Sequence, residues 1–124
     1  MSAITIRLAW PPRELSPNFR SKSWYAKAAA ARMYRQACYV DARAAKDCKT
    51  EYPLKAPVEA LVMFYVTRGR GPDNDNASAM LKAGWDGICD AGILVNDRDI
   101  ASLQVFVEKG LRREVVVILK EREG

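Results

Sequence analysis

The sequence of 124 residues contains no histidine. This absence excludes serine and cysteine hydrolases with a histidine general base, and it excludes nucleases and metal sites that depend on an imidazole. Any catalysis by this chain must therefore use carboxylates, lysine and metal-bound water. A Gly-x-x-x-x-Gly-Lys-Ser/Thr segment is also absent, so we expect no nucleotide cofactor held by such a loop.

Cysteine is scarce, and the chain has only Cys38, Cys48 and Cys89, without a Cys-x-x-Cys pair. Because the start of the sequence also lacks the pattern of a signal peptide, a disulfide framework or zinc site is not expected. We predict reduced thiols in a cytoplasmic protein, with Cys38 and Cys89 filling the core. No apolar run approaches the roughly 18 residues that span a bilayer, so we expect no membrane partner.

The length and the 49% hydrophobic content predict one compact domain over residues 1–124. Apolar alternation and β-branched runs predict strands, whereas long stretches without proline predict helices. The expected order is strand 4–8, helix 23–45, strand 58–67, helix 76–90, strand 100–107 and strand 113–119. This order predicts an α/β (α+β) fold with a mixed sheet and two main helices. We expect 58–67 in the middle of the sheet, Gly92 after the second helix, and a hairpin between the last two strands at Lys109-Gly110.

The positive charge lies mostly in the first part of the chain. Residues 1–50 carry ten Lys/Arg and three Asp/Glu (+7), while residues 51–124 carry ten and twelve (−2), which gives the net +5. A basic region of this kind favours a polyanionic partner, because Lys and Arg that neutralise phosphates release counterions. A solvated basic surface without a partner is the alternative interpretation.

Six aspartates between residues 70 and 100 form an acidic island in this basic protein. The aspartates are Asp73, Asp75, Asp86, Asp90, Asp97 and Asp99. The same segment contains only two cationic residues, Lys82 and Arg98. Carboxylate oxygens are the ligands that Mg²⁺ prefers, so Asp73, Asp75 and Asp97 are candidate metal ligands. The pattern therefore raises the hypothesis of a metal-dependent nuclease.

Each of these residues also has a structural interpretation. The run of Asp and Asn at 73–76 is typical of a turn or helix cap, and Asp97 could open a strand from a loop. On a continuous helix, Lys82 would lie on the same stripe as Asp75 and Asp86 and could reach a phosphate near the carboxylates. Lys82 and Asp86 could equally form an ordinary i, i+4 ion pair.

Several segments together resemble the RusA family of Holliday junction resolvases. The central ones are Asp73-Asn74-Asp75-Asn76, Lys82-x-x-x-Asp86-Gly87, Ala91-Gly92 and Asn96-Asp97. Two further segments are similar to the amino-terminal pattern of phage-type members, Leu8-Ala9-Trp10-Pro11-Pro12 and Leu15-Ser16-Pro17-Asn18. The resemblance extends from about Ile4 to the final strand.

The resemblance implies a single RusA-like endonuclease domain that acts as a homodimer on four-way DNA junctions in recombination and repair. It implies Mg²⁺, with Mn²⁺ as a substitute, an acidic site made of Asp73, Asp75 and Asp97, and Lys82 as the catalytic lysine. The host would be a bacterium or its prophage.

Basic residues near the first helix and before the acidic island are candidates for binding the DNA backbone. They are Arg20, Lys22, Lys27, Arg32, Arg35, Arg68 and Arg70. For each one, a solvated surface position is the alternative. At the level of function, the alternatives are a non-catalytic DNA-binding protein and a flap or fork endonuclease.

Overall fold

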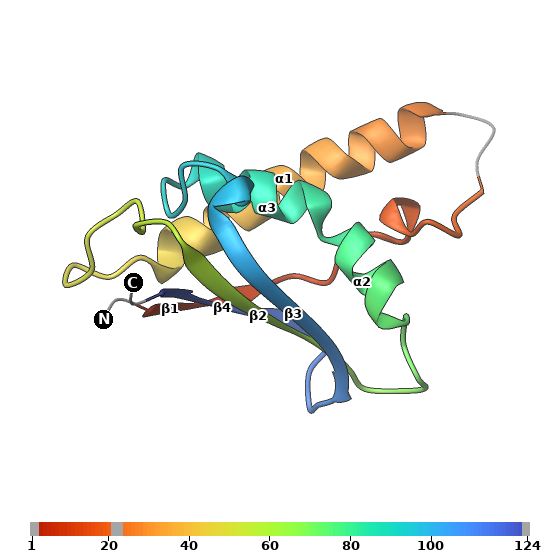
Figure 1. Cartoon of the computed structure of the whole chain (residues 1–124). Helices are drawn as coiled ribbons and strands as arrows, with labels where there is room; N and C mark the ends of the chain where they lie inside the picture. Colours follow the sequence, from red (N-terminus) through yellow and green to blue (C-terminus); the bar gives the residue numbers. More distant parts are fainter. Residues whose placement is uncertain (1–2, 21–23, 123–124) are drawn as a thin grey trace.

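The computed structural model describes residues 3–20 and 24–122, which form one mixed sheet with helices on one of its faces (Figure 1). The strands are β1 (Ala3–Leu8), β2 (Val58–Val66), β3 (Ile100–Lys109) and β4 (Glu114–Glu121). The helices are α1 (Trp24–Ala45), α2 (Asn74–Met80) and α3 (Lys82–Asp90), with short 3-10 turns η1 (Arg13–Leu15) and η2 (Asp97–Asp99). The expected α+β class and mixed sheet are therefore confirmed.

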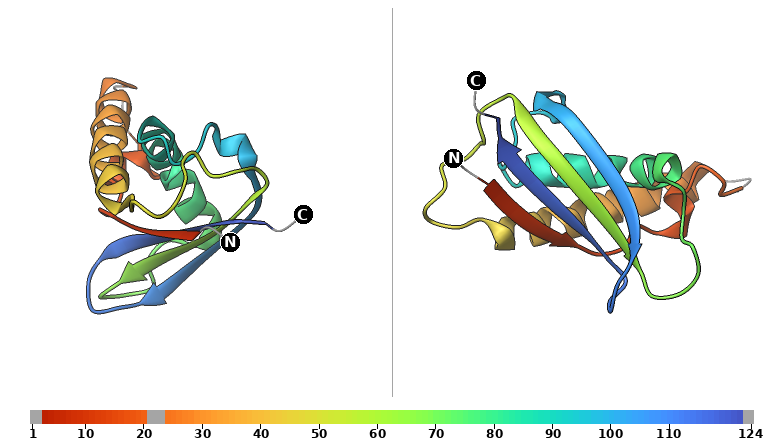
Figure 2. Two further views of the ribbon diagram at one scale, coloured as in Figure 1. Left: turned by 90° about the vertical axis from the view of Figure 1, so that its left-hand side faces the viewer. Right: turned by 60° about the horizontal axis from the view of Figure 1, so that its bottom comes forward.

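The strand order in the sheet is β1-β4-β2-β3 (Figure 2). β2 runs parallel to β3 and antiparallel to β4, and β4 runs antiparallel to β1. The interior position of β2 is confirmed. The predicted hairpin between the last two strands is wrong, because β2 lies between them. The connection crosses the end of β2, where Gly110 N donates to Val66 O at 3.0 Å and a Cβ at Gly110 would lie 2.9 Å from the Tyr65 ring.

Alternate residues of the strands face the helices and form the core. On β2 every second residue from Val58 to Val66 is buried, and Val62 and Phe64 have no exposed surface. Ile6 of β1 and Val117 of β4 are equally buried and lie opposite each other across the strand pair. The helices cover this face of the sheet (Figure 2).

α1 is the longest helix, with 22 residues. It buries Ala30, Tyr34, Cys38 and Ala42, which recur at helical spacing, and the Tyr34 hydroxyl donates to Ala9 O at 2.7 Å. This bond ties the helix to the end of β1. Within the described ranges, no helix combines the length and the apolar character needed to cross a membrane.

The helix predicted for 76–90 is wrong in its details, because it begins earlier and is divided in two. α2 ends at Met80, and α3 begins at Lys82 after Leu81 at φ −88° and ψ −3°. α3 packs on α1, whereas α2 lies against β3, so one straight helix could not follow both surfaces (Figure 1). Asp75 and Lys82 therefore belong to two successive helices and not to one.

Two glycines of α3 allow its close approach to α1. A Cβ at Gly87 would lie against the backbone oxygen of Arg35 and 2.9 Å from both Cys38 Cβ and Tyr39 N. A Cβ at Gly84 would meet only side-chain atoms, the nearest being Leu81 Cδ1 at 2.9 Å. Gly92 follows the helix at φ +81°, which confirms its predicted place at the C-terminal end of the helix.

We expect Gly87→Ala to lower the free energy of unfolding by about 2 kcal/mol, because the backbone of α1 has to move away from the new methyl group. Gly84→Ala is the matched control. There, flexible side chains can shift, and the gain in helix propensity of about 1 kcal/mol offsets their displacement. Urea denaturation of both variants measures the difference. Equal stability of Gly87→Ala and the wild type would contradict the close packing.

Candidate functional site

Asp73 forms the N-cap of α2. Its Oδ1 accepts a hydrogen bond from the backbone N–H of Asn76 at 2.8 Å, and Ala77 N donates to Asp73 O at 2.9 Å. The capping interpretation of this residue is therefore confirmed. Because the cap uses Oδ1, the other carboxylate oxygen of this exposed residue remains available for a second partner.

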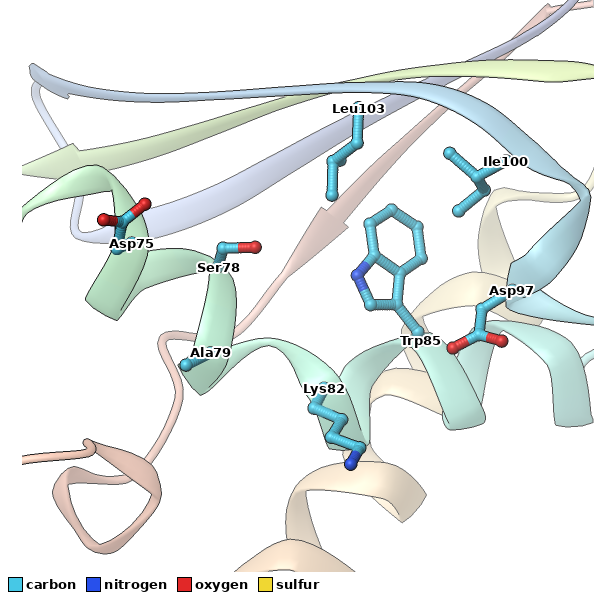
Figure 3. A pocket seen from close by; sticks show the side chains of 8 residues that line it. All are labelled: Asp75, Ser78, Ala79, Lys82, Trp85, Asp97, Ile100 and Leu103. Atoms are coloured by element: carbon cyan, nitrogen blue, oxygen red, sulfur yellow. The ribbon is translucent and has the colours of Figure 1, made fainter.

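Asp75, Lys82 and Asp97 line one cavity of about 500 Å³. They come from α2, from the first residue of α3 and from η2, so the cavity lies along the two helices and the start of β3 (Figure 3). Sequence reasoning missed two other lining residues, Ser78 and Trp85. The recurrence of 75, 78, 82 and 85 at helical spacing was the signal that could have found them.

The three acidic side chains proposed as metal ligands do not form a ready-made cage. Among residues 3–20 and 24–122, no three acidic or cysteine side chains make a group that could hold a metal ion. Asp75 and Asp97 lie at opposite ends of the cavity in Figure 3, and Asp73 does not line it. Mg²⁺, however, commonly keeps several waters and uses one or two carboxylates together with substrate phosphates. The oxygen donors of this cavity fit that mode of binding.

Asp97 lies near the Cys89 thiol and other carboxylates. Its neighbour Asn96 caps η2, where Asn96 Oδ1 accepts from Arg98 N at 2.9 Å and from Arg98 Nε at 3.3 Å. Burial, and then the carboxylates of Asp97 and Asp86, raise the pKa of Cys89 to about 11. The same carboxylates that disfavour a thiolate favour a cation at this end of α3.

Lys82 does not form the i, i+4 ion pair that the sequence allowed. The Lys82 ammonium has no ion pair within the described part of the chain, and Asp86 faces Arg35, with 4.0 Å between Asp86 Oδ2 and the nearest guanidinium nitrogen. Lys82 is exposed and borders two cavities, the one with Asp75 and another with Asp86 and Ala31. Its charge is therefore available to an anion at this surface.

Arg35, expected to bind DNA, is engaged with α3. Its Nε and NH2 donate to the two carboxylate oxygens of Asp90 at 2.7 and 2.9 Å. This bidentate contact holds the pKa of Asp90 below its usual range. Arg35 therefore links α1 to α3 in this structure, with Asp90 as its partner.

The other candidate DNA-binding residues are spread over three segments of the chain. Lys27 and Arg32 are exposed on α1, Arg20 is exposed after η1, and Arg68 and Arg70 are exposed in the loop between β2 and α2. Lys22 lies outside the described residues. Lys27 precedes Ala31 by one turn, and Ala31 borders the cavity that Lys82 shares with Asp86, so Lys27 lies on the side of α1 near that second cavity.

The fold and the cavity define a small α+β domain with two carboxylates and a lysine around one hollow. No family model matches the chain. The chain is 33% identical over 115 residues to an uncharacterized protein of Xylella fastidiosa (strain Temecula1), and the alignment covers 93% of this chain and 73% of that protein. The chain belongs to the same family as this Xylella protein.

Proposed function

We propose that this protein is a Mg²⁺-dependent endodeoxyribonuclease that cuts branched DNA, as its resemblance to the RusA resolvases implies. The observation that carries the proposal is that Asp75, Lys82 and Asp97, which come from three different elements, line one cavity. An exposed lysine that has no ion pair among the described residues, and that lines the same cavity as two exposed carboxylates, is suited to phosphate chemistry, in which negative charge has to be neutralised. The excess of basic residues in the chain supports a polyanionic substrate.

Asp75 and Asp97 would each offer a carboxylate to a metal ion from its own end of the cavity, with water and a substrate phosphate as the other ligands, and the ion would supply Lewis acidity and an activated water for phosphodiester hydrolysis. Asp73 is close in sequence, and its carboxylate oxygen not used by the cap would be a further ligand. Lys82 would neutralise charge at the phosphate as the bond to the leaving oxygen breaks. Trp85, Ile100 and Leu103 line the same cavity and would restrict water on the sheet side.

Resolution of a four-way junction needs two symmetric cuts, and a two-fold dimer provides two identical sites. We therefore propose a homodimer bound to a DNA junction, working in the cytoplasm in recombination and repair. A flap or fork endonuclease would use the same site on a different branch.

A non-catalytic DNA-binding protein is the second candidate, favoured by the cap formed by Asp73 and by the absence of a three-ligand group in the described residues. Comparison of four-way, three-way, flap and linear DNA, each with and without Mg²⁺, tests both. We expect paired nicks in the four-way substrate that require Mg²⁺ or Mn²⁺. Binding without cleavage of any substrate would leave the non-catalytic function, and preferential cleavage of flaps would replace the junction as substrate.

A further inference from the structure

A second cavity of about 450 Å³ lies at the end of the sheet where β1 and β2 finish and β4 begins. Three arginines border it from three separate segments of the chain. Arg13 comes from η1, Arg68 from the loop after β2, and Arg113 from the residue before β4. The topology therefore gathers cations that are 45 and more residues apart in the sequence.

The chemistry of this cavity suits an anion. None of the described residues that line it is acidic. Neither Arg68 nor Arg113 has an ion pair within the described part of the chain, and Arg13 contacts Glu14 at 3.4 Å from a side chain that is 88% exposed. The hydroxyl groups of Ser16 and Thr67 also come from lining residues and can donate hydrogen bonds to a phosphate.

An aromatic side chain fixes one of these arginines. The guanidinium of Arg113 lies over the Trp10 ring, 4.7 Å from its centroid, and Trp10 packs edge to face on buried Phe64. Because Arg113 covers a face of the indole, the ring orients the guanidinium and leaves less area for stacking a base. This arrangement favours recognition of a backbone phosphate, which carries no sequence information.

α2 connects this cavity to the candidate active site. Met80 of α2 borders the arginine cavity, while Asp75, Ser78 and Ala79 of the same helix border the carboxylate cavity. An α-helix is roughly 10 Å wide, a span that corresponds to about three nucleotides along one strand. One DNA strand passing over α2 could therefore place different phosphates in the two cavities.

We propose that Arg13, Arg68 and Arg113 form a phosphate-binding subsite that holds the substrate strand on the other side of α2 from the cut. The inference rests on the proposed nuclease function for its substrate, a DNA strand. The subsite itself needs neither a metal ion nor a cleavage event.

Nuclear magnetic resonance titration of the ¹⁵N-labelled chain without Mg²⁺ tests the subsite. The probe is a 5′-phosphorylated thymidine trinucleotide, and inorganic phosphate is titrated in parallel. We expect the Trp10 indole and Arg113 Nε–H signals to shift saturably with the trinucleotide. Arg113→Gln and Arg13→Gln should each weaken its binding about tenfold, the effect of losing one charge-assisted hydrogen bond.

Arg112→Gln is the matched control, because Arg112 is exposed, does not border the cavity and carries the same charge. Its affinity should equal that of the wild type. Equal weakening by Arg112→Gln and Arg113→Gln, or equal affinity for inorganic phosphate and trinucleotide, would overturn the strand subsite. Arg13→Gln keeps the test decisive if Arg113→Gln does not fold, since the Arg13 side chain is largely solvated.

The two proposals fail in different ways. Selective binding at Trp10 in a protein that cleaves no branched DNA would support the subsite and refute the nuclease. Efficient cleavage by a protein whose Trp10 signal does not respond would refute the subsite alone.

Discussion

Asp75→Asn is expected to lower Mg²⁺-dependent cleavage of a four-way junction on the order of a thousandfold. The amide keeps the size of the side chain but removes a charged oxygen ligand, which Mg²⁺ prefers. Binding of the junction should persist or become tighter, because a negative charge close to the phosphate disappears. Single-turnover cleavage and a binding assay in Ca²⁺ separate these two effects.

Asp99→Asn is the matched control for this experiment. Asp99 belongs to η2, close to Asp97, but it does not line the cavity. Its substitution by Asn removes the same charge as Asp75→Asn. Its cleavage rate should stay within a few-fold of the wild type. If Asp75→Asn cleaves as fast as Asp99→Asn, the carboxylate cavity is not the metal site.

Lys82→Ala is expected to slow single-turnover cleavage by roughly a hundredfold, the scale of removing one electrostatic stabiliser of the transition state. Because Lys82 has no ion pair in the described part of the chain, the free energy of unfolding should change by less than about 0.5 kcal/mol. A rate measurement and a melting curve on the same variant test both statements.

Lys49→Ala, in the exposed connection after α1, controls for the general loss of a positive charge. It should reduce the rate only slightly. A normal rate for Lys82→Ala would move the search for the catalytic cation to Arg68, Arg70 and Arg98.

The sequence predicted every strand within a few residues, because alternation is a local property of the chain. It did not predict which strands are neighbours. The local sequence pattern of residues 109–113 is compatible both with a hairpin and with a connection that crosses another strand. The choice depends on β2, whose end lies under Gly110, more than forty residues away along the chain.

The division between α2 and α3 was beyond local reasoning for a similar reason. The segment 74–90 contains no proline, and its apolar residues recur at helical spacing. The break at Leu81 arises because Gly84 and Gly87 bring α3 close to α1 while α2 lies along β3. The two packing surfaces, α1 for α3 and β3 for α2, exist only in the folded structure, so a local pattern cannot predict the break.

The candidate site was predictable in its residue types but not in its shape. The cap at Asp73 is a local feature and could be read from the Asp and Asn run. Asp97 reaches the cavity of Asp75 and Lys82 because β3 returns parallel to β2, which places η2 beside α3. Arg35 was assigned to DNA, and its contact with Asp90, 55 residues away in sequence, depends on the spacing of α1 and α3.

The position of β4 determines the order in which a newly made chain can complete its sheet. Of the four strands of this sheet, β4 is the last to leave the ribosome, yet it is the strand that joins β1 to β2. The unit of β2, α2, α3 and β3 can form from contiguous residues. β1 pairs only with β4 in the sheet, so its backbone groups have no strand partner until β4 has been made. The chain is therefore committed to its final topology only when residues 114–121 have been synthesised.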